Sequence, residues 1–444
     1  YTHKDRGHGL WRHRYDMNND LTLRMEAEQW SDQEYFKEFF YDEYKNRTTP
    51  RTFANVSYRQ PGYIATATMR VNTHSWIQET ERLPEGSFHL IDRPLVGNFH
   101  VAYDNVTGYN RLDQVDIDGA RTVNIGRLSY NWDPLPALGV TPFYQVEGTW
   151  YQRLSDSNTS ASRFSNLMGV TLETRFHKLY PGMLGFSAFK HIVVPSITYS
   201  YRPSSTLSPY EAPQYDALDN IYGYSRIETK ISNLFLGREA ESNEVWQVGR
   251  ISLYQGNDFW NEVRKSEDYE VEVDIRPRPW WGTQFVGERH TSARYATFEN
   301  PKLFERLFPR IRERIYDYTW REELYGVNRS RADYSRILTQ FYYDNTMLGG
   351  RFNGRVGFAY TDTDGQVYNR EMLYGMGYKL GENWGLGFEH IYNLEADNLR
   401  SQTYELRRKF DCWETAIRVR DRESGFDVNL EVSLLAFPGS AIKF

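Results

Sequence analysis

The final twenty residues of the chain, 425–444, are GFDVNLEVSLLAFPGSAIKF. Polar residues at 427, 429, 431 and 433 separate five apolar residues, which are Phe426, Val428, Leu430, Val432 and Leu434. Successive side chains of a β-strand point to opposite faces, so this alternation predicts a strand with one apolar and one polar face.

The same two-residue period recurs towards the N-terminus, in roughly 20–24 segments of about 9–12 residues. Clear examples are residues 21–30, 63–72, 269–276, 351–360 and 412–420. A tilted strand of about 9–11 residues crosses a bilayer, and closing so large a sheet removes its exposed edges. We therefore predict an all-β fold over residues 1–444: one large antiparallel transmembrane β-barrel of roughly 20–26 strands with long extracellular loops.

Composition agrees with this fold class. The formal net charge of the 444 residues is -6, so the chain lacks the basic footprint of a nucleic-acid-binding protein. The mean hydropathy is -0.71, yet 16% of the residues are aromatic. No apolar run reaches the ~18 residues of a membrane helix, whereas a barrel strand shows only every second residue to lipid.

Aromatic residues near strand ends distinguish a membrane barrel from a soluble β-protein. Girdles of aromatic side chains flank the apolar band of outer-membrane barrels. We expect such positions at Trp30, Tyr63, Trp150, Tyr151, Tyr199, Tyr201, Trp280 and Trp281. The alternative, a soluble propeller or sandwich, predicts strands of about 5–6 residues around small aliphatic cores.

The predicted connections fall into two classes. Residues 274–282 and 379–385 have the proline, glycine and asparagine of tight turns. Residues 31–50 and 201–220 are long and polar, and we expect them to be outward-facing or folded into the lumen. Apolar residues at helical spacing in 303–318 predict a lid that packs on its own loop rather than a membrane-surface helix.

Motifs of catalysis are missing from the sequence. It contains no G-x-S-x-G, no P-loop and no H-E-x-x-H, so we expect neither an enzyme nor a cofactor. Metal binding by His3, His8 and His13 is not favoured, because they lie in an irregular leader and the start of a strand. The first residue is Tyr1 rather than Met, which indicates a processed or trimmed chain.

Cys412 is the single cysteine of the chain. One interpretation is a small hydrophobic residue at the start of a strand. The other is a disulfide bond to a periplasmic domain that precedes this chain, since the periplasm is oxidising. The sequence leaves both open.

Several stretches together resemble the lipopolysaccharide-assembly outer-membrane protein family, LptD. They are WSDQEYFKEFF from position 30, ERLPEGSFHL from 81, NFHVAYDNVTGYNRLD from 98, LGVTPFYQVEGTWYQ from 138, HIVVPSITYSYRP from 191, YDALDNIYGYSRIE from 215 and DCWE from 411. Each motif alone is weak, but all occur in the family's order over most of the chain. The family's periplasmic jelly roll and its adjacent-cysteine pairs are not seen in this sequence.

The resemblance implies a translocon in the Gram-negative outer membrane that inserts lipopolysaccharide into the outer leaflet. Its implied partners are lipopolysaccharide, a plug lipoprotein of the LptE type, a periplasmic bridge protein of the LptA type and the barrel-assembly machinery. Sugars are expected to cross a hydrated lumen, and acyl chains to leave through a lateral seam between the first and last strands. We expect residues 425–435 to form the C-terminal side of that seam, with Phe426, Val428, Leu430, Val432 and Leu434 on its apolar face. Phe444 resembles a terminal assembly signal.

Three other functions fit parts of the sequence. A passive porin or substrate-specific channel uses the same barrel without a plug. An outer-membrane hydrolase needs a catalytic cluster at the rim, and a soluble carbohydrate-binding propeller needs no membrane at all. Ion conductance, a catalytic cluster and extraction without detergent, respectively, distinguish them from a translocon.

Overall fold

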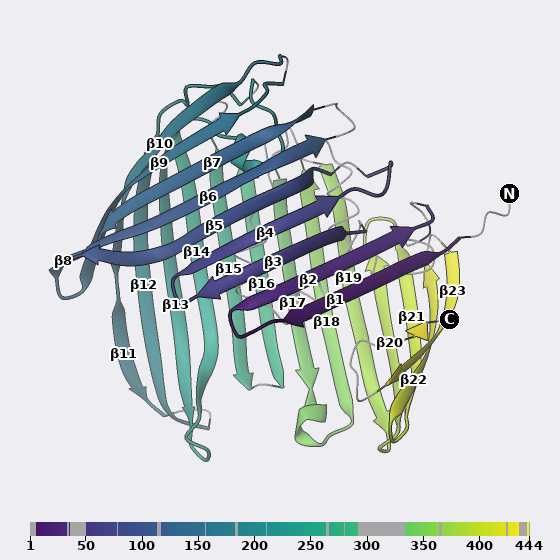
Figure 1. The fold of residues 1–444 in the computed structure, drawn as a ribbon. Helices are drawn as coiled ribbons and strands as arrows, with labels where there is room; N and C mark the ends of the chain where they lie inside the picture. The colour runs from purple at the N-terminus through teal and green to yellow at the C-terminus, as the bar shows by residue number, and fades with distance from the viewer. Residues whose placement is uncertain are drawn as a thin grey trace.

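In the residues that the structure describes, alternating apolar and polar residues produce a single antiparallel sheet of 24 strands (Figure 1). The computed structural model describes residues 6–443, except for 33–34, 36–49, 78, 113–116, 156, 183–184, 210, 263–265, 279, 292–333, 364–365, 423–424 and 435–441. No helix in this described part is long and apolar enough to span a membrane.

The first twelve strands cover the N-terminal half of the sheet. They are β1 His8–Asp16, β2 Leu21–Trp30, β3 Thr52–Gln60, β4 Tyr63–Val71, β5 Glu81–Val96, β6 Phe99–Leu112, β7 Ile117–Tyr130, β8 Trp132–Leu135, β9 Leu138–Tyr151, β10 Ala161–Thr174, β11 Phe176–Pro181 and β12 Phe186–Arg202.

The described part of the C-terminal half contains the other twelve strands and two short 3-10 helices. The strands are β13 Tyr224–Glu239, β14 Val245–Asn261, β15 Glu267–Arg278, β16 Trp281–Thr291, β17 Tyr334–Asp344, β18 Phe352–Thr363, β19 Gln366–Leu380, β20 Trp384–Asn393, β21 Asn398–Lys409, β22 Trp413–Arg422, β23 Gly425–Leu434 and β24 Ile442–Lys443. The helices are η2 Ala217–Asp219 and η3 Asn345–Leu348.

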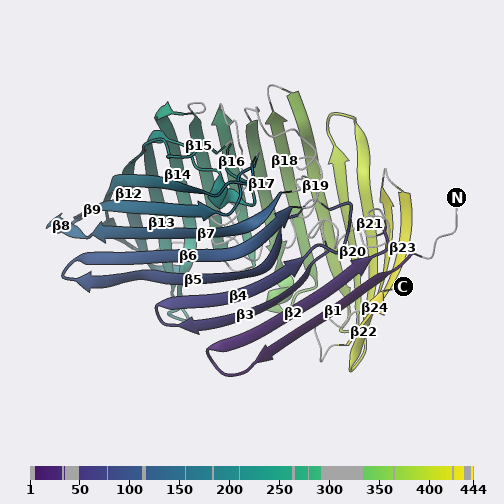
Figure 2. The same cartoon turned by 45° about the horizontal axis from the view of Figure 1, so that its top comes forward.

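Each long strand pairs with the next long strand of the chain. The ladder passes from β7 to β9 and from β10 to β12, because β8 pairs only with β9 and β11 only with β12. The last strand, β24, pairs with β23. Figure 2 shows the result: the purple and blue strands form one wall, and the green and yellow strands form the wall that faces it.

Several predicted strands and turns agree closely with the structure. The predicted segment 21–30 is β2, and the segment 269–276 lies within β15. The predicted turn at 379–385 joins β19 to β20, where Gly381 has a φ of 74° that favours glycine. The predicted helix at 303–318 lies outside the described residues, as does most of the predicted loop at 31–50.

The two faces of the sheet differ in polarity. Large apolar side chains are exposed on the outer face, including Leu253, Phe341 and Leu430. Trp150 and Tyr199 are also exposed, as expected for girdle positions. Trp30 and Tyr151 are not: they are 2% and 0% exposed, so their assignment to an outer girdle was wrong.

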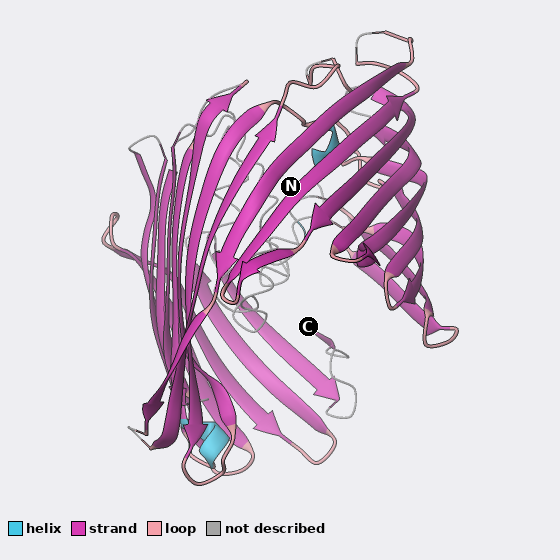
Figure 3. Ribbon diagram, turned by 90° about the vertical axis from the view of Figure 1, so that its left-hand side faces the viewer, coloured by secondary structure: helices cyan, strands magenta, loops and turns pink. Residues whose placement is uncertain are grey.

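The sheet is open between β1 and β23. Among the described residues, no ladder joins these two strands. Figures 1 and 2 show β1 starting near β23 and running away from it. Figure 3 shows the curvature of the sheet from the side, with η2 inside the space that the two walls enclose.

Candidate translocation lumen and lateral seam

The inner face of the sheet is lined by charged side chains that pair between strands. Arg226 of β13 lies 3.0 Å from Asp258 of β14, and Arg336 of β17 lies 2.7 Å from Glu288 of β16. Cross-strand pairs of opposite charge stabilise neighbouring strands and leave a polar wall of mixed sign. Other polar side chains buried in the wall include Glu85, Glu147, Glu272 and Arg420.

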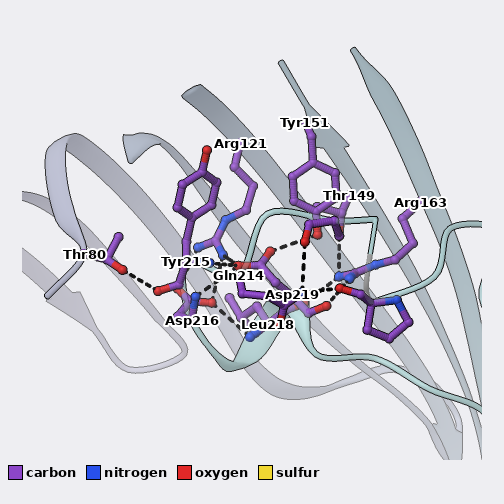
Figure 4. A network of polar contacts seen from close by, with 12 residues as sticks. Thr80, Arg121, Thr149, Tyr151, Arg163, Gln214, Tyr215, Asp216, Leu218 and Asp219 are labelled. Carbon is purple, nitrogen blue, oxygen red and sulfur yellow. Dashed lines mark hydrogen bonds and ion pairs between the residues drawn. The ribbon is translucent and has the colours of Figure 1, made fainter. Parts of the chain in front are cut away.

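The loop between β12 and β13, residues 203–223, is fixed to this wall by a buried ion-pair network (Figure 4). Arg121 of β7 donates two hydrogen bonds to Asp216, at 2.8 and 2.7 Å. The same guanidinium donates to Asp219 at 2.6 Å. Two adjacent carboxylates therefore share one arginine, and the side chains of Arg121 and Asp219 are both fully buried.

Two further strands hold the same loop. The hydroxyl of Tyr151 in β9 donates to Asp219 at 2.9 Å. Arg163 of β10 donates to the carbonyl oxygens of Leu218 and Asp219, at 2.5 Å each. The hydroxyl of Thr80 in the β4–β5 connection donates to the carbonyl of Tyr215 at 2.6 Å. The loop is therefore a fixed part of the inner surface.

Burial and charge set the ionisation of the loop residues. Burial raises the pKa of Tyr215 to about 12. Burial also acts to raise the pKa of Asp216, but the hydrogen bonds and charge of Arg121 outweigh it, so that pKa lies below its ordinary value. Burial raises the pKa of Asp219, although the charge of Arg121 opposes this. Asp216 is thus the carboxylate that Arg121 holds ionised.

The predicted seam strand is β23, which lies at one end of the sheet. It pairs with β22 along its whole length, from Trp413↔Leu434 to Arg422↔Gly425. Its apolar residues Phe426, Val428 and Leu430 are exposed, at 67%, 56% and 38%. The side chain of Val432 is half-buried, and that of Leu434 lies outside the described part of the structure.

The inner side of this region carries linked charges. Arg422 lies 2.5 Å from Asp427 of β23. Arg418, on the same face of β22, lies 2.6 Å from Glu405 of β21 and 3.8 Å from Glu431 of β23. β23 therefore places an apolar surface outward and acidic side chains inward, beside the arginines of β22.

Cys412 lies in the turn between β21 and β22 and is an exposed free thiol. Beside it, the rings of Phe410 and Trp413 stack at 3.9 Å. Cys412 directly precedes β22, which agrees with the start of a strand. The predicted disulfide stays a prediction, and the predicted signal at Phe444 lies outside the described residues.

His8 and His13 contact an acidic and an aromatic side chain, respectively. His8 lies 2.9 Å from Glu28, and the ring of His13 stacks on Trp11. Within the described ranges, no three His, Cys, Asp or Glu side chains are grouped as metal ligands. His3 lies outside those ranges.

The network of Arg121, Asp216 and Asp219 was not among the predicted functional residues. The D-x-x-D of YDALDN was a visible signal, since two carboxylates three residues apart need partners if they are buried. Arg121 itself gave no signal, because one arginine on the polar face of a strand is ordinary for a barrel.

Three solved structures illustrate what the chain is similar to. The siderophore receptor PirA of Pseudomonas aeruginosa has 9% identity and a TM-score of 0.38 over 97% of this chain and 72% of its own. PirA of Acinetobacter baumannii has 7% identity and a TM-score of 0.36 over 97% and 74%. The FrpB iron transporter of Neisseria meningitidis has 9% identity and a TM-score of 0.33 over 86% and 71%.

Sequence comparison identifies the family of the chain. No curated protein matches the chain. A family model described as "LptD: LPS transport system D" matches residues 4–239, which is just over half of the 444 residues. The chain therefore belongs to the LptD family, whose members are non-enzymatic lipopolysaccharide transport proteins of the Gram-negative outer membrane.

Proposed function

We propose that this protein inserts lipopolysaccharide into the outer leaflet by separating its two parts. The sugar crosses the hydrated lumen, and the acyl chains leave sideways at the edge of β23. The observation that carries this proposal is the open edge itself: within the described residues, β23 pairs with β22 and β24 but not with β1.

Polarity on the two sides of β23 supports this division. The exposed row of Phe426, Val428 and Leu430 suits hydrocarbon, and the inward Asp427 and Glu431 suit water. Unpaired backbone groups are costly inside a membrane, so a seam that opens must have few ladder bonds to break. The edge of β23 away from β22 suits this requirement, because within the described residues only Glu431 and Val432 pair there, with β24.

The proposed partner proteins bind at different places on the sheet. We place the short turns, including that of Cys412, in the periplasm, where a disulfide to a periplasmic domain can form. A bridge protein of the LptA type delivers lipopolysaccharide at this end. A plug lipoprotein of the LptE type fills the lumen, and the barrel-assembly machinery recognises the segment ending at Phe444. The barrel forms one domain.

A reversible lock on β23 tests the lateral route. Cysteines at Phe426, Val428 or Leu430 are paired with cysteines on the strand found to face β23, and oxidation closes the seam. The control is Thr415→Cys with Val432→Cys, which are ladder partners inside the wall. Export of lipopolysaccharide to the cell surface should stop only in the seam lock and return on reduction. Normal export with the seam locked contradicts the proposal.

A passive porin is distinguished by its conductance. The proposed translocon should co-purify with a small lipoprotein and conduct ions only after that lipoprotein is removed. Steady conductance of the purified protein as isolated, with no lipoprotein bound, favours a porin.

A further inference from the structure

Arg408 is an outward-facing arginine near the end of β21. Its direct cross-strand partners are Trp384 of β20 and Thr415 of β22. Directly opposed residues share one face of a sheet, and Trp384 is exposed on the outer face. Leu406, two positions before Arg408 on the same strand, is exposed there as well. Arg408, which is itself exposed, therefore lies on the apolar outer face of the wall.

Two aromatic rings hold the guanidinium of Arg408. Its central carbon lies 4.9 Å from the ring centroid of Trp384 and 4.6 Å from that of Phe410. The ring of Phe410 in turn stacks on Trp413 at 3.9 Å. A cation near a ring face is attracted by the π electrons, so these contacts do not use its N–H donors. The rings therefore position the guanidinium and leave its donors available.

Among the described residues, Arg408 differs from the other arginines of β21 and β22 in having no carboxylate partner. Each of the others forms an ion pair; they are Arg400, Arg407, Arg418, Arg420 and Arg422. Arg407, the preceding residue on the inner face, lies 2.7 Å from Glu405 and 3.4 Å from Glu414. The positive charge of Arg408 is therefore not neutralised by any described residue.

The position of Arg408 along the strand is that of a membrane interface. Trp384 begins β20 and Trp413 begins β22, directly after the short connections at 381–383 and 410–412. Tryptophan rings at the strand ends of an outer-membrane barrel mark the level of the lipid headgroups. The available donors of Arg408 therefore lie where the anionic groups of a bilayer lie.

We propose that Arg408, held by Trp384 and Phe410, binds the phosphate diester of a glycerophospholipid from the surrounding bilayer. A guanidinium donates two parallel N–H···O hydrogen bonds to a phosphate, and its planar fork matches that anion. Leu406 and Ile417, which are exposed ladder partners one pair further along the strands, offer an apolar surface to the acyl chains. The site goes beyond the proposed function; only the name of its leaflet, the periplasmic one, rests on the placement of the short turns.

Native mass spectrometry of the full-length protein, purified in mild detergent with its co-purifying partners, tests this site with defined lipids. Arg408→Gln removes the charge, and Arg408→Lys keeps the charge but not the planar fork. Arg407→Gln is the matched control on the opposite face of the same strand. The probes are dioleoylphosphatidylglycerol, dioleoylglycerol, which lacks the phosphate, and inorganic phosphate. Titration of each probe gives the affinity of the first bound molecule for each variant.

We expect the wild type and Arg407→Gln to bind the phospholipid at least about tenfold more tightly than Arg408→Gln, because the variant loses charge-assisted hydrogen bonds. Arg408→Lys should lose a smaller factor, and it carries the test should Arg408→Gln not fold. Dioleoylglycerol should bind all variants equally weakly, and inorganic phosphate should not displace the phospholipid.

Three results would overturn the proposal. Equal phospholipid affinity of the wild type and Arg408→Gln shows that the arginine binds no headgroup. Binding of dioleoylglycerol as tightly as of the phospholipid shows that the phosphate is not recognised. Displacement of the phospholipid by inorganic phosphate shows a site for free anions. None of these measurements depends on lipopolysaccharide export, so failure here is distinct from failure of the proposed function.

Discussion

Arg121 and Asp219 lie 98 positions apart in the chain and 2.6 Å apart in the structure, with both side chains fully buried. A buried ion pair repays its desolvation only when further hydrogen bonds satisfy it. Here Asp216, Tyr151 and two backbone N–H groups supply those bonds. The pair therefore determines the position of the loop at 203–223, and with it the shape of the lumen.

Loss of Arg121 should release that loop. Arg121→Met leaves the fully buried carboxylate of Asp219 and the half-buried one of Asp216 without the guanidinium that they share. Removing one partner of a buried ion pair costs about 3–5 kcal/mol. Chymotrypsin should then cut at Tyr215 or Leu218, and mass spectrometry identifies the products. The wild type, in which Tyr215 is buried, should stay uncut there. Arg153→Met is the matched control, because Arg153 pairs with Asp118 at 2.8 Å on a partly exposed surface. That change should cost at most about 1 kcal/mol and leave the loop protected.

Acid should weaken the same contact through Asp216. Because its pKa is lowered in the folded state, ionised Asp216 stabilises the docked loop above the ordinary value of 3.8. This contribution is lost as the pH falls below 3.8 towards the folded-state pKa. Pepsin cleavage of the loop, followed from pH 5 downwards, should accelerate over this range.

Asp216→Asn separates this effect from that of Asp219. Because the pKa of Asp219 is raised, its contribution to the stability of the docked loop changes with pH in the opposite direction. The wild type should lose protection below pH 3.8 relative to Asp216→Asn, and the difference between the two should be constant above it. A difference that does not change with pH contradicts the assignment to Asp216.

Adjacent residues of β23 should respond oppositely to the same substitution. Val428→Arg places a charge on the outer face near the middle of the strand, at a cost of about 2–4 kcal/mol in a bilayer. Asn429→Arg places it on the inner face, near Asp427, and should be tolerated. Urea titration of the barrel refolded in lipid vesicles compares the two variants. Equal tolerance of both variants contradicts an outer face in contact with lipid.

The exposed thiol of Cys412 gives a direct chemical test of the predicted disulfide. An exposed free thiol reacts fully with maleimide, so its reactivity reports its redox state. In the full-length protein isolated from cells, Cys412 should be unreactive until a reductant is added. Cys412→Ser should abolish the mobility shift between reduced and non-reduced gels. Full labelling before reduction contradicts the disulfide.

Much of this architecture was predictable, because alternation reports which face of a strand meets lipid. The strand at 425–434 and the turn containing Gly381 followed from residue type and spacing alone. Antiparallel all-β architecture, the family and the outer-membrane location were likewise predicted and are confirmed. These properties depend on local sequence, where each residue is judged against its immediate neighbours.

Properties that depend on distant residues were not predictable in the same way. Trp30 has the composition of a girdle residue, yet its indole N–H donates to Glu28 and its backbone N–H to His74. The burial of Tyr151 depends on Asp219, 68 positions later in the chain. Alternation assigns a side chain to a face, but it does not say which loop will cover that face.

The unequal connections at the two ends of the sheet have a consequence for biogenesis. At one end, two residues join β3 to β4 and β5 to β6; at the other, 21 residues join β2 to β3 and 42 join β16 to β17. Polar backbone cannot pass through hydrocarbon without its hydrogen bonds. The long connections therefore cross a membrane only along the polar inner face of the sheet, away from hydrocarbon, whereas the two-residue turns carry little polar backbone of their own.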